Sequence, residues 1–320
     1  MLKQGCRPPE YCGSPSSYPS DFNETARTQR EMPTLALRSL SHGLLCRSWT
    51  KPSLLLRAHS SNAAVNQSRG GLPRFYSPSL PSSKGNGVRI QGDEFWHMTR
   101  VLRLSVNDRV ELFNGAGGLV EGSIQRVDKT GLDIIALDDP KVISPLGIRW
   151  HVFAAFGSLK GGRADWLIEK CTELGASSVT PLLTERSHTI GENRVERLQR
   201  VILAAVKQCQ RLHEMTLNPP VNFCNFLPIV AQSKLSFLAA AEATPLLSIL
   251  PNSNTEDSGL LIVGPEGDFT DEEIKMIKEA GATPVGLGPC RLRVETATIT
   301  LLATLMLWSD AQNLGAQQSQ

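Results

Sequence analysis

This chain of 320 residues lacks several features that would place it in a common class of protein. It has no run of eighteen or more apolar residues, so we expect neither a membrane-spanning helix nor a membrane partner. Its seven cysteines are scattered and none forms a CxxC pair, which argues against a metal site or a disulfide framework. It also has no GxGxxG motif and no Gly-Lys-Ser/Thr sequence, so a phosphate-cradling P-loop is not expected.

Acidic residues are missing from a long N-terminal stretch. Between residues 32 and 92 there is no Asp or Glu, and residues 32–61 mix Arg, Ser and Leu, which is the composition of an organelle transit peptide. We therefore expect residues 1–71 to form a transit peptide or disordered leader that directs the protein to a chloroplast or a mitochondrion. Met32 is a candidate for the true start. A disordered tail without a targeting role is the alternative.

The charge balance changes when this leader is set aside. The whole chain has a formal net charge of +2, whereas the residues after 71 carry 24 basic and 27 acidic side chains, a net charge of −3. The remaining protein is not globally basic, so any binding of nucleic acid must use local patches.

Short strands are expected over residues 72–142, because apolar residues there alternate or run together between glycine and Asn-Asp turns. The expected strands cover residues 87–90, 108–115, 119–127 and 131–138, and a short helix fits residues 93–104. This pattern predicts a small β-barrel-like module.

From about residue 143, strands alternate with helices, which predicts a parallel α/β sheet. Strands are expected at residues 148–156, 177–183, 234–241, 260–263 and 283–288, and helices at 163–175, 193–213, 271–281 and 295–312. Thr270 and Glu273 have the spacing of a capping box, which marks the start of the third of these helices. The last helix is apolar nearly all round, so we expect it to be buried.

Two glycine-containing loops follow expected strands in this second part. Gly264-Pro265-Glu266-Gly267 follows one strand, and Leu287-Gly288-Pro289 lies at the end of the last one. Ligands of open α/β sheets bind where strands end, and glycine lets the backbone approach a ligand closely. Each loop alone is also compatible with an ordinary tight turn, but the two together favour a ligand site.

A charged cluster, Arg291, Arg293 and Glu295, precedes the apolar last helix. An acidic residue near a helix N-terminus is stabilising by about 0.3–1 kcal/mol, so Glu295 has an ordinary explanation. An arginine there faces an unfavourable helix dipole, which makes Arg293 the better functional candidate.

Six motifs, taken in order, resemble the bacterial RsmE family of small-subunit (16S) ribosomal RNA methyltransferases, which act on N3 of a uridine. The motifs are RFY (74–76), HMTRVLRL (97–104), KGGRADWLIEKCTELGASSVTPLLTERS (160–187), KQCQR (207–211), LIVGPEGDFTDEE (261–273) and LGPCRLRVETA (287–297). The resemblance covers about residues 72–310 and places the chain in the SPOUT superfamily.

The resemblance implies more about the fold than the periodicity shows. It implies a PUA-like RNA-binding β-barrel over residues 72–142, a SPOUT domain with a trefoil-knotted parallel sheet over 143–314, and a short tail over 315–320. Proteins of this family are homodimers, and their partner is small-subunit rRNA or the assembled small ribosomal subunit.

The resemblance also implies that S-adenosylmethionine is the cofactor. The residues expected to contact it are Gly264, Pro265, Glu266, Gly267, Leu287, Gly288, Leu292, Arg293, Thr296 and Ala297. Asp268 stands where a third glycine is frequent in the family, and Val294 stands where threonine is frequent. Both departures concern details of the site and not its class.

The chemistry of uridine N3 suggests the catalytic candidates. The N3 proton must leave before methylation, and the resulting anion spreads onto two carbonyl oxygens, so the site needs a proton acceptor and cationic donors. Arg186 and Arg293 are candidates for orienting the uracil or stabilising its charge, and Glu295 is a candidate base beside bulk water. An ion pair between Arg186 and Glu185 is the alternative explanation for Arg186.

Contact with RNA is expected from basic and polar residues in both parts of the chain. The candidates are Arg74, Arg100, Arg103, Lys160, Gln208 and Arg211. Two other functions remain open from the sequence alone: a SPOUT methyltransferase that acts on another RNA such as tRNA, and a non-catalytic RNA-binding factor for ribosome assembly.

Overall fold

The computed structural model describes residues 71–187, 190–251 and 255–318. The predicted leader over residues 1–71 lies outside these residues apart from Gly71. Within the described ranges, no helix is long and apolar enough to span a lipid bilayer.

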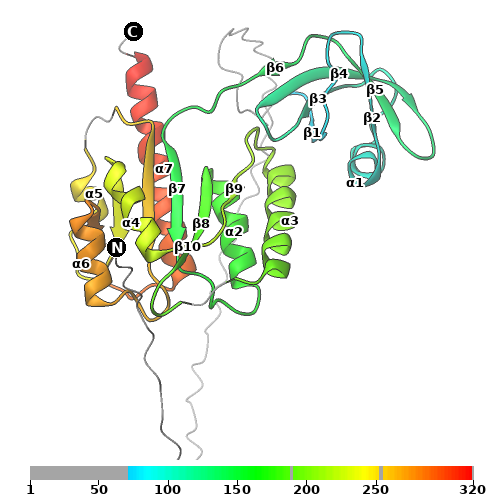
Figure 1. The fold of residues 1–320 in the computed structure, drawn as a ribbon. Helices are drawn as coiled ribbons and strands as arrows, with labels where there is room; N and C mark the ends of the chain where they lie inside the picture. Colours follow the sequence, from blue (N-terminus) through cyan, green and yellow to red (C-terminus); the bar gives the residue numbers. More distant parts are fainter. Residues whose placement is uncertain (1–70, 188–189, 252–254, 319–320) are drawn as a thin grey trace, which may run out of the picture. The chain divides into compact units, whose positions relative to one another are not determined.

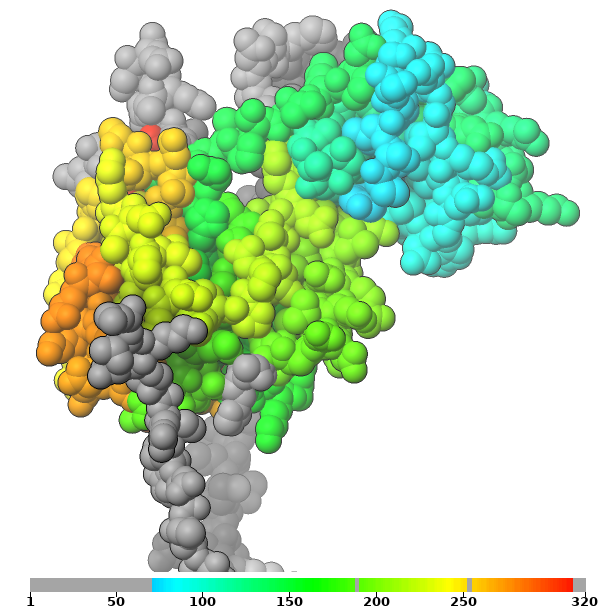
Figure 2. All heavy atoms as spheres, in the orientation of Figure 1, coloured from blue at the N-terminus to red at the C-terminus, as the bar shows by residue number. Residues whose placement is uncertain are grey.

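The first sheet has six strands, and it contains the strands predicted for residues 72–142. They are β1 (Arg74–Tyr76), β2 (Gly87–Ile90), β3 (Arg109–Phe113), β4 (Gly118–Val127), β5 (Leu132–Ala136) and β6 (Lys141–Val142). Their order is β1-β3-β4-β5-β2 with β6 beside β4, and only the β1–β3 pair is parallel. Figure 2 shows this part of the chain as one continuous cyan-to-green surface region.

One face of this sheet covers a hydrophobic core. In β5, Leu132, Ile134 and Ala136 are buried while the residues between them are not, because side chains alternate between the two faces of a strand. A short helix α1 (Gly92–Trp96) continues as one π-helical turn, η1 (His97–Val101). The helical segment therefore ends at Val101, three residues before the predicted end.

The second sheet has seven strands, all paired in parallel, as the alternation of strands and helices predicted. They are β7 (Arg149–Ala154), β8 (Ser178–Leu183), β9 (Thr216–Leu217), β10 (Val221–Asn222), β11 (Ser236–Ala239), β12 (Ser258–Val263) and β13 (Thr283–Val285). The order is β10-β8-β7-β12-β11-β13, with β9 beside β8. Strand β12 thus lies between β7 and β11.

Helices cover both faces of this sheet (Figure 1). On one face α2 (Arg163–Leu174), α3 (Glu192–Cys209) and α7 (Val294–Gln318) share a core, and on the other α4 (Phe223–Gln232) and α6 (Asp271–Glu279) share a second core. Neighbouring residues of the strands divide between these cores: Val152 belongs to the first and Phe153 to the second. Both faces of the strands are buried, which explains their continuous apolar sequence.

Several details differ from the sequence prediction. Helix α3 ends at Cys209 because Gln210 adopts a left-handed conformation with φ 56°, so it is shorter than predicted. Helix α7 continues to Gln318, past the boundary predicted at residue 314. The capping box of Thr270 and Glu273 at the start of α6 is confirmed.

Helix α4 was not predicted from the sequence. It contains Pro228, which has no N–H for the helix and normally ends one. Two features stabilise it: the side chain of Asn222 accepts a hydrogen bond from Asn225 N, and Phe226 and Val230, one turn apart, are fully buried. A short helix α5 (Leu246–Ile249) was also missed.

Candidate functional site

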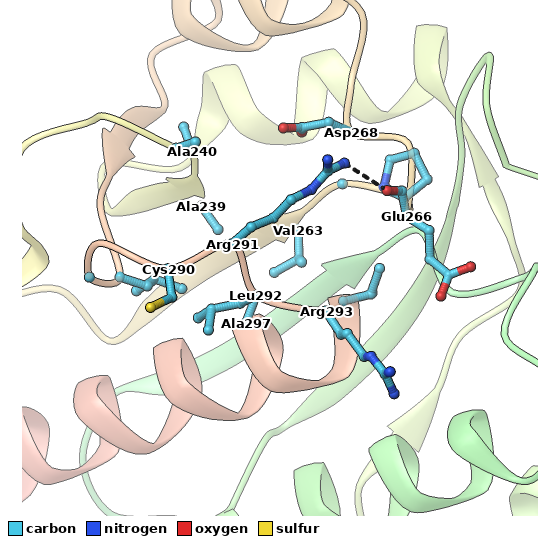
Figure 3. Close-up of a pocket in the computed structure, with 16 residues that line it drawn as sticks. Ala239, Ala240, Val263, Glu266, Asp268, Cys290, Arg291, Leu292, Arg293 and Ala297 are labelled. Atoms are coloured by element: carbon cyan, nitrogen blue, oxygen red, sulfur yellow. Dashed lines mark hydrogen bonds between the residues drawn. The ribbon is translucent and has the colours of Figure 1, made fainter. Parts of the chain in front are cut away.

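A pocket of about 300 Å³ opens at the carboxyl ends of β11, β12 and β13 (Figure 3). These three strands lie next to one another in the sheet, so the loops that follow them meet at one edge. The pocket is lined by Ala239, Ala240, Ala241, Val263, Gly264, Pro265, Glu266, Asp268, Leu287, Gly288, Cys290, Arg291, Leu292, Arg293, Val294 and Ala297. This is the location expected for a ligand of an open α/β sheet.

The two loops chosen from the sequence both contribute walls to this pocket. Of the predicted cofactor residues, Gly264, Pro265, Glu266, Leu287, Gly288, Leu292, Arg293 and Ala297 line it. Gly267 and Thr296 are not among the lining residues. Gly267 belongs to the same loop and accepts a hydrogen bond from Arg186, whereas Thr296 is exposed on α7.

The loop after β12 has little room for larger residues. A Cβ on Gly264 would lie 2.9 Å from Cδ2 of Phe269, a buried ring, so glycine is required there. Asp268 has φ 63°, in the left-handed region that favours glycine, and its Oδ1 accepts a hydrogen bond of 2.8 Å from Phe269 N. Asp is one of the few other residues that tolerates this region, because it can bond its own backbone. The loop therefore keeps its conformation without a third glycine.

A third wall of the pocket was missed in the sequence. Ala239 ends β11, Ala240 and Ala241 follow it, and their small side chains leave room between the loops. Strand β11 was expected, but no local pattern indicated that it lies between β12 and β13. Arg291 was also missed as a lining residue, and its Nη2 donates to the Glu266 carbonyl oxygen at 3.3 Å, across the pocket mouth.

An arginine that was not singled out from the sequence connects the walls. Arg163, the first residue of α2, donates from Nε and Nη2 to the two carboxylate oxygens of Glu295, both at 2.8 Å. Its Nη1 donates to Oε1 of Glu266 at 2.6 Å. Arg163 thus joins the start of α2 to the loop after β12 and to the first turn of α7. Its place in the KGGRADW motif was the only signal in the sequence.

This ion pair argues against Glu295 as the catalytic base. The side chain of Glu295 is 9% exposed, and the hydrogen bonds from Arg163 hold the pKa of its carboxyl below the ordinary value of 4.5. A carboxylate with a lowered pKa is a weak proton acceptor, and both of its oxygens are already occupied. Glu295 instead holds the start of α7 in place through its hydrogen bonds with Arg163.

The two candidate arginines lie close to the loops of the pocket. Arg186 donates from Nη1 to the Gly267 carbonyl oxygen at 2.7 Å, and within the described residues it has no ion pair with Glu185. Arg293 lines the pocket and is exposed, and Figure 3 shows its side chain extending away from that of Arg291. Neither guanidinium is buried, so both remain accessible to an incoming group.

The predicted RNA contacts divide into two groups. Arg74 is 8% exposed and pairs with Glu111 at 2.8 Å, and Arg211 donates to the carbonyl oxygens of Thr172, Gly175 and Ala176 at the end of α2. These two arginines stabilise the fold, which leaves their predicted contact with RNA without support. The exposed candidates are Arg100, Arg103, Lys160 and Gln208.

The pocket suits a ligand that has an apolar part and several charged groups. Its walls are aliphatic at Val263, Leu287 and Leu292, whereas its rim carries the charges of Glu266 and Arg293. Among residues 71–187, 190–251 and 255–318, no group of His, Cys, Asp or Glu side chains could hold a metal ion.

Comparison with known proteins identifies the family. Residues 148–306 match a family model described as an RNA methyltransferase domain, and residues 90–137 match one described as an RNA methyltransferase PUA domain. Ribosomal RNA small subunit methyltransferase E of Synechocystis is 32% identical over 222 residues, which are 68% of this chain and 72% of that protein. The chain belongs to the ribosomal RNA small subunit methyltransferase E family. The Bacillus subtilis member of this family is 27% identical over 68% of this chain and 88% of its own length.

Solved structures agree with membership of the methyltransferase E family. A Legionella pneumophila protein, solved in complex with the cofactor SAM, has 28% sequence identity and a TM-score of 0.61, covering 74% of this chain and 98% of that one. The crystal structure of a Porphyromonas gingivalis protein described as an rRNA-methyltransferase has 26% sequence identity and a TM-score of 0.63. The match covers 75% of this chain and 99% of that one. The predicted family and fold class, a PUA-like domain before a SPOUT-type parallel sheet, are confirmed. The trefoil knot stays a prediction.

Replacing Glu295 with glutamine should lower the free energy of unfolding at pH 7 by about 1.5–3 kcal/mol, because Arg163 loses its charged hydrogen-bond partner. The folded-state pKa of Glu295 is lowered, so its contribution is complete above pH 4.5 and is lost as the pH falls through the lower folded value. The difference between variant and wild type should therefore shrink in acid.

Urea unfolding at pH 7 and at successively lower pH measures this difference. Glu279→Gln, at the exposed end of α6, is the control and should differ little from wild type at any pH. Equal stability of Glu295→Gln and wild type at pH 7 would show that the ion pair does not stabilise the fold.

Proposed function

We propose that this protein transfers a methyl group from S-adenosylmethionine to N3 of a uridine in small-subunit ribosomal RNA. The observation that carries the proposal is the pocket at the ends of β11, β12 and β13, whose walls are the two loops that resemble the family's cofactor loops. Membership of the methyltransferase E family and the SAM-bound Legionella relative support the same assignment.

The residues of the pocket fit this cofactor. S-adenosylmethionine supplies a methyl group on a positively charged sulfur, and its transfer needs in-line positioning and no metal. Gly264, where a Cβ would fill the space against Phe269, and Gly288, with φ 113°, allow the backbone to approach an adenine ring. The carboxylate of Asp268, which lines the pocket, is compatible with the positive charge of the ligand, whereas that of Glu266 is paired with Arg163.

The two accessible arginines would act on the uracil. As the N3 proton leaves, negative charge develops on the flanking carbonyl oxygens, and Arg186 and Arg293 are placed beside the cofactor loops to stabilise it. Because Glu295 is paired with Arg163, we propose that bulk water, and not Glu295, accepts the N3 proton of the uridine. The nearby guanidinium groups of the two arginines lower the pKa of uridine N3, so a weak proton acceptor such as water is sufficient.

Replacing Arg293 or Arg186 with alanine should lower kcat for methylation of small ribosomal subunits by about 10²–10³-fold, the usual effect of removing one donor to a developing oxyanion. Both side chains are exposed, so the thermal midpoint should stay that of the wild type. The measurement is transfer of labelled methyl groups to subunits that lack the modification.

Lys278→Ala removes an exposed cation from α6, away from the pocket residues, and serves as the control with unchanged kcat. Near wild-type turnover of Arg293→Ala would refute its assignment to the site. Calorimetry with S-adenosylmethionine gives a separate readout. If the wild-type protein does not bind S-adenosylmethionine at millimolar concentration, the proposed methyltransferase activity is refuted.

The organelle address is part of the proposal and rests on the lack of acidic residues between residues 32 and 92. A fluorescent fusion of the first hundred residues should enter a chloroplast or a mitochondrion. Cells without the protein should then lack N3-methyluridine in the small-subunit rRNA of that organelle. An unchanged modification profile would contradict the assignment to small-subunit rRNA and leave another RNA, such as tRNA, as the substrate.

We also infer that the protein acts as a homodimer. Leu307 on α7 is 71% exposed and Trp166 on α2 is 44% exposed, and large apolar side chains on the surface favour association. Sedimentation velocity should give the mass of a dimer, and Leu307→Glu should shift it towards the monomer. Leu247→Glu, on α5 and 74% exposed, is the control, and a wild-type monomer at micromolar concentration would contradict the dimer.

A further inference from the structure

The helical segment of the first domain exposes an unusual set of side chains. Trp96 is 60% exposed, Val101 is 49% exposed and Leu102 is 44% exposed. Arg100 and Arg103 are exposed beside them. Within the described residues, neither guanidinium has a hydrogen bond or an ion pair, and the Trp96 ring has no aromatic or cation–π contact.

Helix geometry places these side chains on the outer side of the segment. Residues four apart along a helix are neighbours, and the wider π-turn also brings residues five apart together, so Trp96 lies beside Arg100 and Val101. The opposite side is fixed in the domain, because Met98 is fully buried. The indole therefore faces solvent next to a guanidinium.

Arg103 occupies a backbone position that favours glycine. Its φ is 55°, and it follows the last turn of the segment, where Leu102 N bonds His97 O at 3.0 Å and Leu104 N bonds Met98 O at 2.9 Å. Left-handed residues that close a helix in this way are usually glycine, because a Cβ is unfavourable there. Arg103 therefore combines an unfavourable backbone conformation with an exposed side chain that has no intramolecular partner among the described residues, and such backbone outliers cluster at functional sites.

The charges around this segment favour an anionic ligand. Of the two acidic residues on α1, Glu94 is paired with Lys207 at 3.4 Å, and Asp93 lies at the helix N-terminus, where a negative charge is stabilising. An exposed indole beside the guanidinium of Arg100, with Arg103 in the same exposed segment, matches an unpaired nucleotide, since the base can stack on the ring while the arginines bind phosphates.

We propose that Trp96 stacks on an unpaired base of the RNA substrate and that Arg100 and Arg103 bind the adjacent phosphates. The choice of RNA as the ligand rests on the proposed function. This surface replaces the predicted contact through Arg74, whose guanidinium is held by Glu111. A protein that docks on the apolar side chains is the competing occupant, and the experiment below separates the two.

The test measures binding of the full chain to a fluorescein-labelled single-stranded RNA and to its duplex, by anisotropy over a range of salt concentrations. Trp96→Ala should weaken binding to the single strand by about 5–100-fold, the range for loss of one base stack. Binding to the duplex should change little, because its bases are not free to stack. Trp96→Phe keeps an aromatic ring and should retain most of the affinity.

The arginines should give a different signature from the tryptophan. Each phosphate contact adds about 0.7 to the slope of log affinity against log salt for single strands, so Arg100→Gln should reduce the slope by about that amount. Trp96→Ala should leave the slope unchanged. Arg103→Gly should reduce it as well, without lowering the thermal midpoint, because glycine suits the left-handed backbone there.

Leu247→Ala, which removes an exposed apolar side chain on α5, is the control and should bind RNA as the wild type does. Wild-type affinity of Trp96→Ala for single strands would overturn the proposal and favour a protein partner for this surface. If the wild type methylates rRNA and Trp96→Ala binds RNA normally, the RNA contact through Trp96 is refuted and the proposed function stands. If the wild type binds RNA through Trp96 but does not methylate rRNA, the proposed function is refuted and the RNA contact stands.

Discussion

The ion pair between Arg163 and Glu295, extended to Glu266, is the interaction on which the pocket depends. Its three members come from the start of α2, the first turn of α7 and the loop after β12. In the part of the chain that the structure describes, no hydrogen bond between strands joins these three segments. The carboxylate of Glu295 is nearly buried, so it is stable there only with a partner. Arg163 provides that partner with two parallel bonds, a geometry in which lysine cannot replace it.

Backbone conformation sets the second constraint on the site. The loop after β12 passes so close to Phe269 that Gly264 has no room for a side chain, and Asp268 takes a left-handed turn with a hydrogen bond to the next backbone nitrogen. The departure of Asp268 from the family pattern is therefore compatible with the same loop. Together with the ion pair, these turns fix two walls of the pocket before any ligand arrives, which lowers the entropy lost on binding.

Charged residues were the least predictable part of the site. Arg74, Arg211 and Glu295 are of the residue types expected for RNA contact or proton transfer, yet each is committed to a partner within the fold. In contrast, Arg100 and Arg103 have the same residue type and remain without a partner among the described residues. What a charged side chain does depends on whether its neighbours neutralise it, and those neighbours come from distant parts of the chain. The glycines were more predictable, because their role depends on the local backbone.

Local sequence patterns were enough to locate nine of the thirteen described strands, most helices, the capping box at Thr270 and the two loops that line the pocket, but not the short strands β1, β6, β9 and β10. These features depend on neighbours within a few residues, through periodicity, glycine conformation and side-chain caps. Tertiary structure alone decided that β11 lies beside β12 and β13, which adds the alanine wall, and that Arg163 meets Glu295 across 132 residues of chain. Strand order and long-range ion pairs arise from the packing of the whole domain, so no local pattern encodes them.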